Sequence, residues 1–199
     1  MGTPDELWYQ SHQPGAKAQV DSFRRLERLC LPESMDGYRV LDIGCNEGFF
    51  CHQAVLRGAR EVIGIDVDDI FLGRAQALYG ADPKITFLKQ SWQDLPGGEF
   101  DLILWTSAMH YEPSPYSVLA NIASRLSRSG VFVLECGVHP DDKPAMVRSI
   151  RHDGCFWYPT RKYLESLLRK AGFAFRVVSE PENIGLDPVP PHSVPLHPS

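Results

Sequence analysis

Residues 40–48 read VLDIGCNEG, an apolar run that ends in a loop with two glycines. Gly44 follows the run directly, and Gly48 directly precedes a segment of helix-forming residues that starts at Phe49. Glycine permits the unusual dihedral angles of a tight turn and the close approach of a ligand, and the N-terminus of the next helix offers unsatisfied N–H groups. We therefore expect a strand, a ligand-binding loop and a helix, in that order.

The rest of the chain repeats this alternation of strand and helix. The apolar, β-branched runs lie at residues 39–43, 61–66, 85–88, 100–105 and 131–135. Runs of this kind are typical of strands buried on both faces of a parallel sheet. We expect helices at 17–30, 49–57 and 69–79, then from Ser114-Pro115 and from Pro159-Thr160 to Gly172, and a late strand at 173–178.

Length and composition favour one domain with one core. The chain has 199 residues, of which 43% are hydrophobic. We place that domain at residues 1–180, with an N-terminal helical cap. Six of the sixteen prolines fall in residues 181–199, which should be an irregular tail or a linker to another domain.

Charge and cysteine content indicate the setting of the protein. The formal net charge of -5 gives no excess of positive charge for a phosphate backbone, so a nucleic acid is not the expected partner. The five cysteines are odd in number and dispersed, which favours a reducing, cytoplasmic location. No apolar run approaches the roughly 18 to 20 residues that span a bilayer, so no membrane association is expected.

Asp66 is the second strong signal. It ends the second apolar run, eighteen residues beyond Gly48. A carboxylate there can accept hydrogen bonds from both ribose hydroxyls of a nucleoside cofactor. The nicotinamide-type fingerprint G-x-G-x-x-G would need glycine at position 46, where this chain has Asn46, so the loop reads instead as D-x-G-x-x-x-G.

With these features the chain resembles the class I S-adenosylmethionine-dependent methyltransferases. The resemblance covers about residues 38 to 136, and its motifs are Asp42 with Gly44 and Gly48, Asp66, residues 90–96 (QSWQDLP), residues 100–103 (FDLI) and residues 126–130. It implies an α/β fold with an open, mostly parallel, Rossmann-like sheet of about seven strands, the last one antiparallel, and helices on both faces.

The resemblance also implies S-adenosylmethionine as the cofactor, with S-adenosylhomocysteine as the product. Two positions depart from the family pattern, because Asn46 replaces the middle glycine and Ser91 replaces the acid that commonly flanks the adenine amino group. Adenine would then be held by backbone N–H groups near Ser91 and Trp92 and by apolar contact. The cofactor-binding residues expected are Asp42, Gly44, Cys45, Asn46, Gly48, Phe49, Asp66, Val67, Ser91, Trp92 and Thr106.

Two histidines are candidate general bases. His110 follows the fourth strand, at the end of the sheet where open α/β folds bind ligands, and His139 follows the fifth. Either can instead have a packing role, and Asp141 or Asp142 is a further candidate base. No set of cysteines and histidines supplies the paired ligands of a zinc site, and we expect no metal.

The methyl acceptor is less well specified. We expect an oxygen of a small molecule or saccharide, bound by a wall made of Phe156-Trp157-Tyr158 with Arg148, Arg151 and Arg161. Residues 151–173 loosely resemble the branch that transfers a carboxymethyl group to the wobble uridine of tRNA, and a (carboxy)methyltransferase of this type is the alternative. A catalytically silent cofactor-binding module, a nicotinamide oxidoreductase and a homodimer also stay open.

Overall fold

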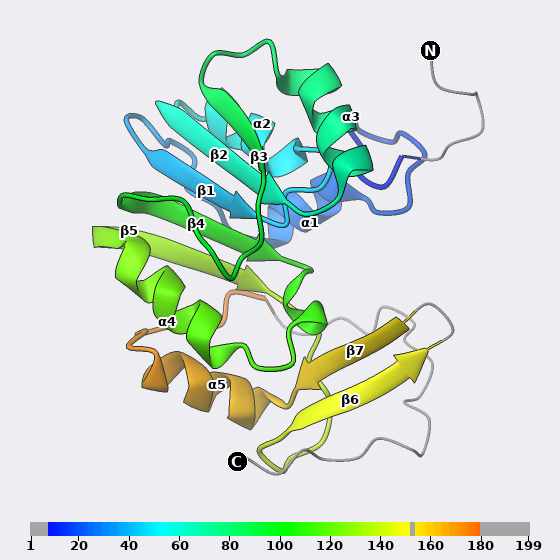
Figure 1. Ribbon diagram of the computed structural model, residues 1–199, viewed down its shortest axis with the longest axis vertical. Helices are drawn as coiled ribbons and strands as arrows, with labels where there is room; N and C mark the ends of the chain where they lie inside the picture. Colours follow the sequence, from blue (N-terminus) through cyan, green and yellow to red (C-terminus); the bar gives the residue numbers. More distant parts are fainter. Residues whose placement is uncertain (1–7, 152–153, 180–199) are drawn as a thin grey trace. The chain divides into compact units, whose positions relative to one another are not determined.

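Five strands form the main sheet in the order β3-β2-β1-β4-β5 (Figure 1). Their bounds are β1 (Arg39–Ile43), β2 (Glu61–Asp66), β3 (Ile85–Lys89), β4 (Phe100–Thr106) and β5 (Leu126–Glu135). Strand β2 pairs in parallel with both β1 and β3. This computed structural model describes residues 8–151 and 154–179, and it confirms the α/β fold with a mostly parallel sheet.

The chain divides into two compact units. The first contains the residues up to Leu104 together with Arg125–Val133, and the second contains Trp105–Ser124 and the residues from Leu134 onward. In the first unit Asp101 holds neighbouring strands together: its Oδ2 accepts from the backbone N–H of Arg39 at 2.9 Å, and its Oδ1 from the hydroxyl of Ser127 at 2.9 Å.

Three helices belong to the first unit: α1 (Ser22–Arg28), α2 (Phe49–Leu56) and α3 (Asp69–Tyr79). Helix α3 has the bounds expected from the sequence, because the side chain of Asp68 caps its N-terminus by accepting from the N–H of Ile70 at 2.7 Å. Helix α1 is shorter than the predicted 17–30. The N–H groups of Gln19 and Val20 bind the carbonyls of residues 8 and 9 instead, so the helix begins only after its cap at Asp21.

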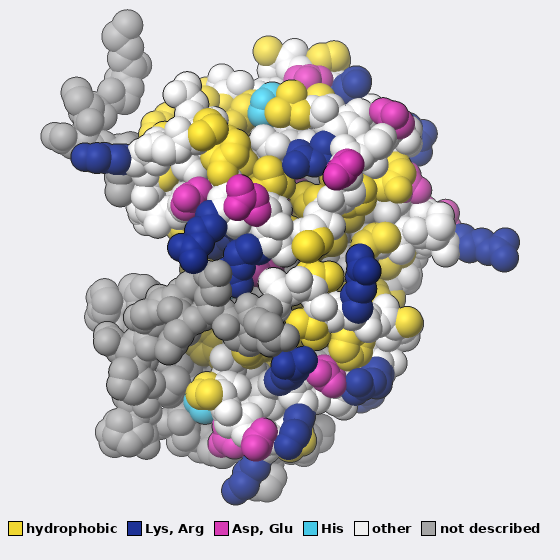
Figure 2. Space-filling view, turned by 180° about the vertical axis from the view of Figure 1, so that it is seen from behind, with side chains coloured by type: hydrophobic (Ala, Val, Ile, Leu, Met, Phe, Trp, Pro, Cys, Tyr) yellow, Lys and Arg dark blue, Asp and Glu magenta, His cyan; other side chains and the backbone are white. Residues whose placement is uncertain are grey.

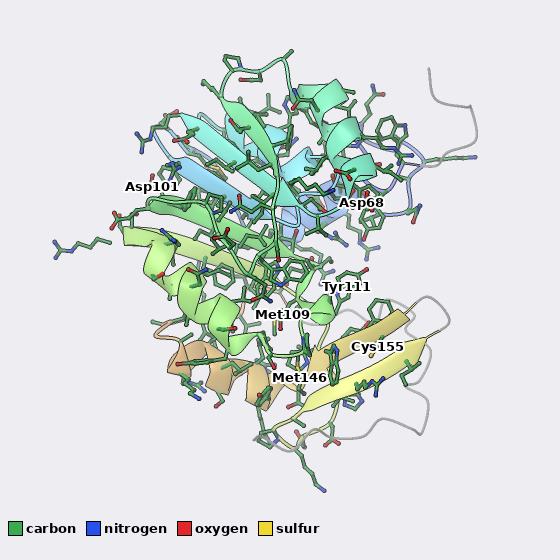
Figure 3. The ribbon with its side chains drawn as sticks, in the orientation of Figure 1. Asp68, Asp101, Met109, Tyr111, Met146 and Cys155 are labelled. Atoms are coloured by element: carbon green, nitrogen blue, oxygen red, sulfur yellow. The ribbon has the colours of Figure 1, made fainter. Side chains whose placement is uncertain are left out.

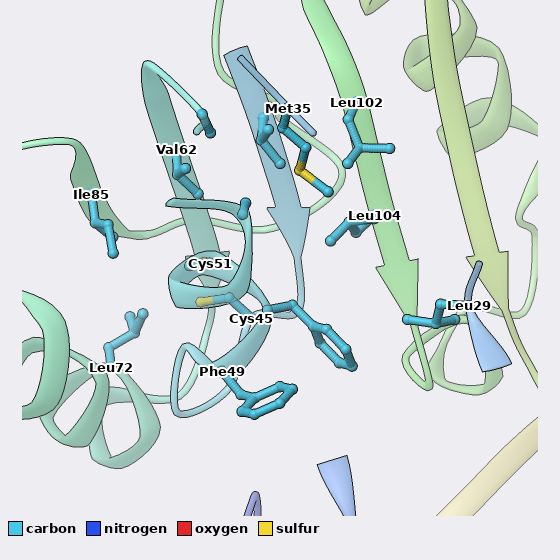
Figure 4. Close-up of a cluster of buried hydrophobic side chains, with 14 residues drawn as sticks. Leu29, Met35, Cys45, Phe49, Cys51, Val62, Leu72, Ile85, Leu102 and Leu104 are labelled. Atoms are coloured by element: carbon cyan, nitrogen blue, oxygen red, sulfur yellow. The ribbon is translucent and has the colours of Figure 1, made fainter. Parts of the chain in front are cut away.

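The core of the first unit lies between its sheet and these helices. Val40 and Val62 from the strands are completely buried with Phe49 and Cys51 of α2, and Leu72 of α3 joins them (Figure 4). The opposite side chains of the strands, Leu41 and Ile43 among them, are also buried. Burial on both faces explains why these strands lack polar alternation.

The second unit contains a hairpin that the sequence did not predict. Its elements are the 3₁₀ helix η1 (Met109–Tyr111), α4 (Tyr116–Arg125), the antiparallel pair β6 (Met146–Arg151) and β7 (Gly154–Pro159), and α5 (Arg161–Lys170). Helix α5 starts where expected, because the hydroxyl oxygen of Thr160 accepts from the N–H of Tyr163.

Two expectations about strands were wrong. Residues 173–178 form no strand, because Phe173 completes the cap of α5: its N–H binds the carbonyl of Leu168 at 2.9 Å, and Gly172 takes a left-handed φ of 94°. Strand β5 begins at Leu126 and not at 131. The predicted tail at 181–199 lies outside the described residues.

No helix in the described part of the chain is long and apolar enough to cross a bilayer.

Candidate functional site

The glycine loop lies between β1 and α2 and is bound to the next strand. The N–H groups of Gly44 and Cys45 both donate to the carbonyl of Ile65, at 2.8 and 3.0 Å. Gly44, Asn46 and Gly48 have left-handed backbone angles, with φ of 71°, 53° and 83°. The loop therefore folds back on itself at the carboxyl ends of β1 and β2, the edge at which open α/β sheets bind ligands.

Asp66 holds this loop in place. Its Oδ2 accepts from the N–H of Asn46 at 2.9 Å, and its Oδ1 accepts from the N–H groups of Val67 at 2.7 Å and Asp68 at 3.0 Å. A carboxylate has about four lone-pair positions, so roughly one is left for a ligand. The structure thus gives Asp66 a structural role that sequence analysis missed, beside the predicted ribose contact.

Two exposed apolar side chains follow this carboxylate in the sequence, on either side of Asp68 and Asp69. The side chains of Val67 and Ile70 are 56% and 66% exposed. An acceptor of hydroxyl hydrogen bonds beside exposed apolar groups fits a nucleoside, whose sugar is polar and whose base has apolar faces. The residues present therefore fit the adenosine part of S-adenosylmethionine.

Gly48 and Phe49 are fixed by packing. A Cβ on Gly48 would lie 2.8 Å from Cζ of Phe87 and 3.2 Å from Cβ of Ala75. The ring of Phe49 is buried and meets Phe23 edge-on, with ring centroids 5.0 Å apart. These contacts account for a small residue at 48 and a large apolar one at 49 whether or not a ligand is bound, so their cofactor roles remain predictions.

Asp42 lies beneath the loop, among thiols. It is completely buried, its Oδ2 accepts from the Sγ of Cys51 at 3.3 Å, and its Oδ1 has no hydrogen-bond partner. Burial raises the pKa of Asp42 to about 7; the bond from Cys51 lowers it, and the nearby charge of Asp66 raises it further. Cys45 is buried as well, and both thiols would touch a Cβ placed on Gly64.

The remaining predicted cofactor residues lie at the ends of strands. Ser91 follows β3 and forms a turn, because its hydroxyl accepts from the N–H of Gln93 at 3.2 Å. Trp92 is half-buried beside it, and Thr106 is buried at the end of β4. Thr106 belongs to the second compact unit and the others to the first.

In the second unit, His110 lies in an aromatic cluster. Its ring centroid is 4.3 Å from that of Tyr111, 5.5 Å from that of Phe156, and 6.1 Å from that of Tyr158, on which it is stacked at 21°. Tyr111 remains 57% exposed (Figure 3). Helix η1 and strand β7 together thus present a partly exposed aromatic surface around one imidazole.

The predicted substrate wall divides over two faces of the hairpin. Side chains alternate along a strand, and Arg148 pairs with Trp157 while Val147 pairs with Tyr158. Arg148 lies 5.9 Å over the ring of Trp157, and its Nε donates to the Sγ of Cys155 at 3.1 Å. Only Phe156 and Tyr158 join the His110 cluster, so the arginine and the stacked rings are separate features.

The other predicted groups have local partners. The Nδ1 of His139 accepts from the N–H of Asp141 at 3.2 Å, and Arg161 pairs with Glu165. Among residues 8–151 and 154–179 no group of three or more His, Cys, Asp or Glu side chains could hold a metal ion.

Ser107 and Glu135 form a pair that sequence analysis missed. Ser107 has a left-handed φ of 50° although it is not glycine, and its hydroxyl donates to Oε2 of Glu135 at 2.9 Å. The N–H of Ser107 also donates to the carbonyl of Glu135 at 2.9 Å. Strained residues often lie at functional sites, and this one follows β4 three residues before His110.

Comparison with known proteins identifies the family. A family model described as "Methyltransferase domain" matches residues 34–172. The curated relatives include tRNA U34 carboxymethyltransferases from Alcanivorax borkumensis, 31% identical over 70% of this chain and 46% of that protein, and from Pseudomonas paraeruginosa, 33% identical over 69% and 45%. The chain therefore spans less than half the length of these relatives.

Solved structures agree on the fold. An S-adenosylmethionine-dependent methyltransferase from Mesorhizobium loti is 25% identical and aligns with a TM-score of 0.65 over 77% of this chain and 81% of that one. A putative S-adenosylmethionine-dependent methyltransferase from Listeria monocytogenes, 21% identical, gives 0.64 over 75% and 79%. Since the family model matches more than half of the sequence, this chain belongs to the methyltransferase domain family, within the class I S-adenosylmethionine-dependent methyltransferases.

Proposed function

We propose that this chain binds S-adenosylmethionine and catalyses methyl transfer to an oxygen atom of a small molecule or saccharide. The observation that carries the proposal is the Asp66 carboxylate, which is bound to the N–H of Asn46 and adjoins the exposed side chain of Val67. A hydroxyl acceptor beside an exposed apolar side chain supports adenosine binding at this edge of the sheet. The bound cofactor would supply a methyl group activated by a sulfonium.

The residues of the chain would orient and enclose the reactants. The remaining acceptor position of Asp66 would bind a ribose hydroxyl, and Val67 would contact the adenine. His110 would take the proton of the acceptor hydroxyl on a ring nitrogen, as a general base in the second unit. The rings of Phe156 and Tyr158 restrict the imidazole of His110, and the exposed ring of Tyr111 offers an aromatic face on which a sugar can stack.

The charges on the surface suit a small acceptor. On the face drawn in Figure 2, Lys and Arg side chains are interspersed with acidic and apolar ones and do not form one continuous patch. A protein that tracks a phosphate backbone generally concentrates positive charge along its contact surface. The net charge of -5 points the same way.

A second candidate acceptor is the wobble uridine of tRNA, which is suggested by the names of the curated relatives. One structural observation favours it. Tyr111, which packs against His110, is 57% exposed. An exposed aromatic ring of this kind offers a face on which an RNA base can stack.

Calorimetry followed by methyl-transfer assays tests the proposal. We expect S-adenosylmethionine and S-adenosylhomocysteine to bind with micromolar dissociation constants and NADH not to bind. Purified chain would then be incubated with hydroxylated small molecules and sugars and methyl-labelled S-adenosylmethionine. In parallel it would be incubated with tRNA and either this cofactor or its labelled carboxymethyl sulfonium analogue, because the curated relatives are named carboxymethyltransferases. Label on a small acceptor alone would support the first candidate, and label on tRNA alone the second. Failure to bind either adenosyl compound would refute both.

A further inference from the structure

Glu47 of the glycine loop is completely buried although it is a carboxylate. Its two oxygens receive hydrogen bonds from several directions. Oε2 accepts from the N–H of Gln10 at 2.7 Å, and Oε1 accepts from the N–H of Tyr9 at 3.3 Å and from Nη1 of Arg74 at 2.8 Å. Such a set of charge-assisted bonds satisfies a buried charge that would otherwise be costly.

The same N-terminal segment, residues 8–12, also binds the start of α2. The side-chain oxygen of Gln10 accepts from the N–H of Phe49 at 3.1 Å, and Gln10 itself is 4% exposed. The N–H groups of the first turn of a helix have no partner within the helix, so this bond fills one of those positions. Residues 8–12 are therefore bound to the glycine loop on both sides of Gly48.

Helix α3 closes the network. The guanidinium of Arg74 lies 5.2 Å over the ring of Trp8, and Nδ1 of His12 is 2.8 Å from the hydroxyl of Tyr79, while Nε2 of His12 is 3.4 Å from Glu47. Burial opposes the charge on Glu47, but the bonds from His12, Gln10, Arg74 and Tyr9 together lower the pKa of Glu47. The carboxylate stays ionised and joins the N-terminal segment, the loop and α3.

The position of Glu47 links this network to Asp66. Asn46, the residue before it, holds a left-handed φ of 53° and donates its N–H to Asp66. Asparagine adopts this conformation more readily than most residues other than glycine, and the bond to Asp66 holds Asn46 in it. Asn46 is bound to Asp66, and its neighbour Glu47 is bound to residues 9, 10 and 74. These bonds restrain the loop on two sides.

We propose that Glu47 is a positioning residue for the cofactor loop. It holds Asn46 against Asp66, and cofactor affinity therefore depends on residues 8–12, which precede the span 34–172 matched by the family model. The identity of the ligand in this inference rests on the proposed function, whereas the ordering of the loop by Glu47 does not.

The test replaces Glu47 with Gln in the full chain. Glutamine keeps the shape but loses the charge and turns its NH₂ group toward donors, which destabilises the network. We expect the dissociation constant for S-adenosylhomocysteine, measured by calorimetry, to rise at least tenfold. Glu47→Asp keeps the charge and should recover most of that loss. Glu61→Gln is the matched control, since Glu61 pairs with Arg39 at 2.7 Å near the start of β2, and its dissociation constant should stay within twofold of the wild type.

Hydrogen exchange provides a readout that does not need the ligand. In Glu47→Gln, amides in residues 8–12 and 44–49 should exchange at least tenfold faster, and those of α5 should not change. Faster exchange at 8–12 with unchanged exchange at 44–49 and unchanged affinity would overturn the inference, because Glu47 would then only tether the N-terminal segment. If Glu47→Gln does not fold, Gln10→Ala takes its place, because it removes the bond between the side chain of Gln10 and the N–H of Phe49. The same readouts apply, and we expect the dissociation constant for S-adenosylhomocysteine to rise about threefold. A wild-type chain that fails to bind S-adenosylhomocysteine would refute the proposed function, while exchange at 44–49 would still decide the positioning role.

Discussion

The Oδ2 atom of Asp66 and the backbone N–H of Asn46 are joined by a 2.9 Å hydrogen bond across the carboxyl ends of β1 and β2. The residues are twenty positions apart in the sequence and belong to adjacent strand ends. Their bond couples the acid that is proposed to bind the ribose with the loop that is proposed to bind the rest of the cofactor. A change at either residue should therefore affect both the loop and the ligand.

Replacing Asp66 with Ala removes the acceptor for three backbone N–H groups and for the proposed ribose contact. We expect the dissociation constant for S-adenosylhomocysteine to increase more than tenfold in calorimetric titration, with a smaller loss of thermal stability. Asp69→Ala is the control, because Asp69 is exposed and pairs with Lys89 at 2.5 Å on the surface of α3. Equal affinity in the wild type and Asp66→Ala would contradict the proposed role.

Asp42 should make stability depend on pH. Its pKa in the folded state is about 7, against an ordinary value of 3.8, because burial disfavours the charged form. The folded state thus retains a proton that the unfolded state releases. The contribution of this group to the free energy of unfolding is therefore fully present below about pH 4, decreases as the pH rises, and is lost above about pH 7. The shift of about three pKa units corresponds to at most about 4 kcal/mol.

Asp42→Asn should remove that dependence. Urea unfolding between pH 5 and 8 is expected to show a flatter profile than the wild type, and the variant should be the more stable protein at pH 8. Asp69→Asn, an exposed substitution, should leave the profile unchanged. A wild-type slope retained in Asp42→Asn would show that another group titrates.

Gly48→Ala should destabilise the fold without any ligand. The new Cβ would lie 2.8 Å from Phe87, at a backbone φ of 83°. We expect a loss of about 1–3 kcal/mol in the free energy of unfolding, from overpacking and backbone strain. Adding Phe87→Leu to Gly48→Ala should recover the part of the lost stability that is due to the clash. If the effects of the two substitutions on the free energy of unfolding simply add, the contact with Phe87 is not the cause.

His110→Ala should separate binding from turnover. Because His110 belongs to the second unit and Asp66 to the first, we expect cofactor affinity within twofold of the wild type and a turnover number reduced by about 10²–10⁴ if His110 is the general base. Phe156→Leu, which keeps the imidazole and changes a ring that packs on it, should reduce turnover less. Unchanged turnover in His110→Ala would leave the histidine with a packing role only.

Local sequence patterns determined most of the first unit. Three elements have the predicted bounds: the strands at 39–43 and 61–66 and the helix at 69–79. Their signals are a continuous apolar run for each strand and the cap at Asp68 for the helix, and these signals act within a few residues. The glycine loop and Asp66 could be singled out for the same reason, because their spacing along one strand, loop, helix and next strand is a property of a short stretch of sequence. Family membership followed from these motifs.

Contacts between distant segments were decided only by the tertiary structure. Tyr9 and Gln10 bind Glu47 across nearly forty residues, and the β6–β7 hairpin separates Trp157 from the rings that contact His110. Residues 173–178 have a strand-like composition but form no strand, and Phe173 completes the C-terminal cap of helix α5. A short apolar segment becomes a strand only if a neighbouring backbone supplies hydrogen bonds, and a buried carboxylate becomes stable only if donors converge on it from elsewhere in the chain. Neither condition can be seen in a local pattern, whereas the periodicity and capping that place a helix or a buried strand can.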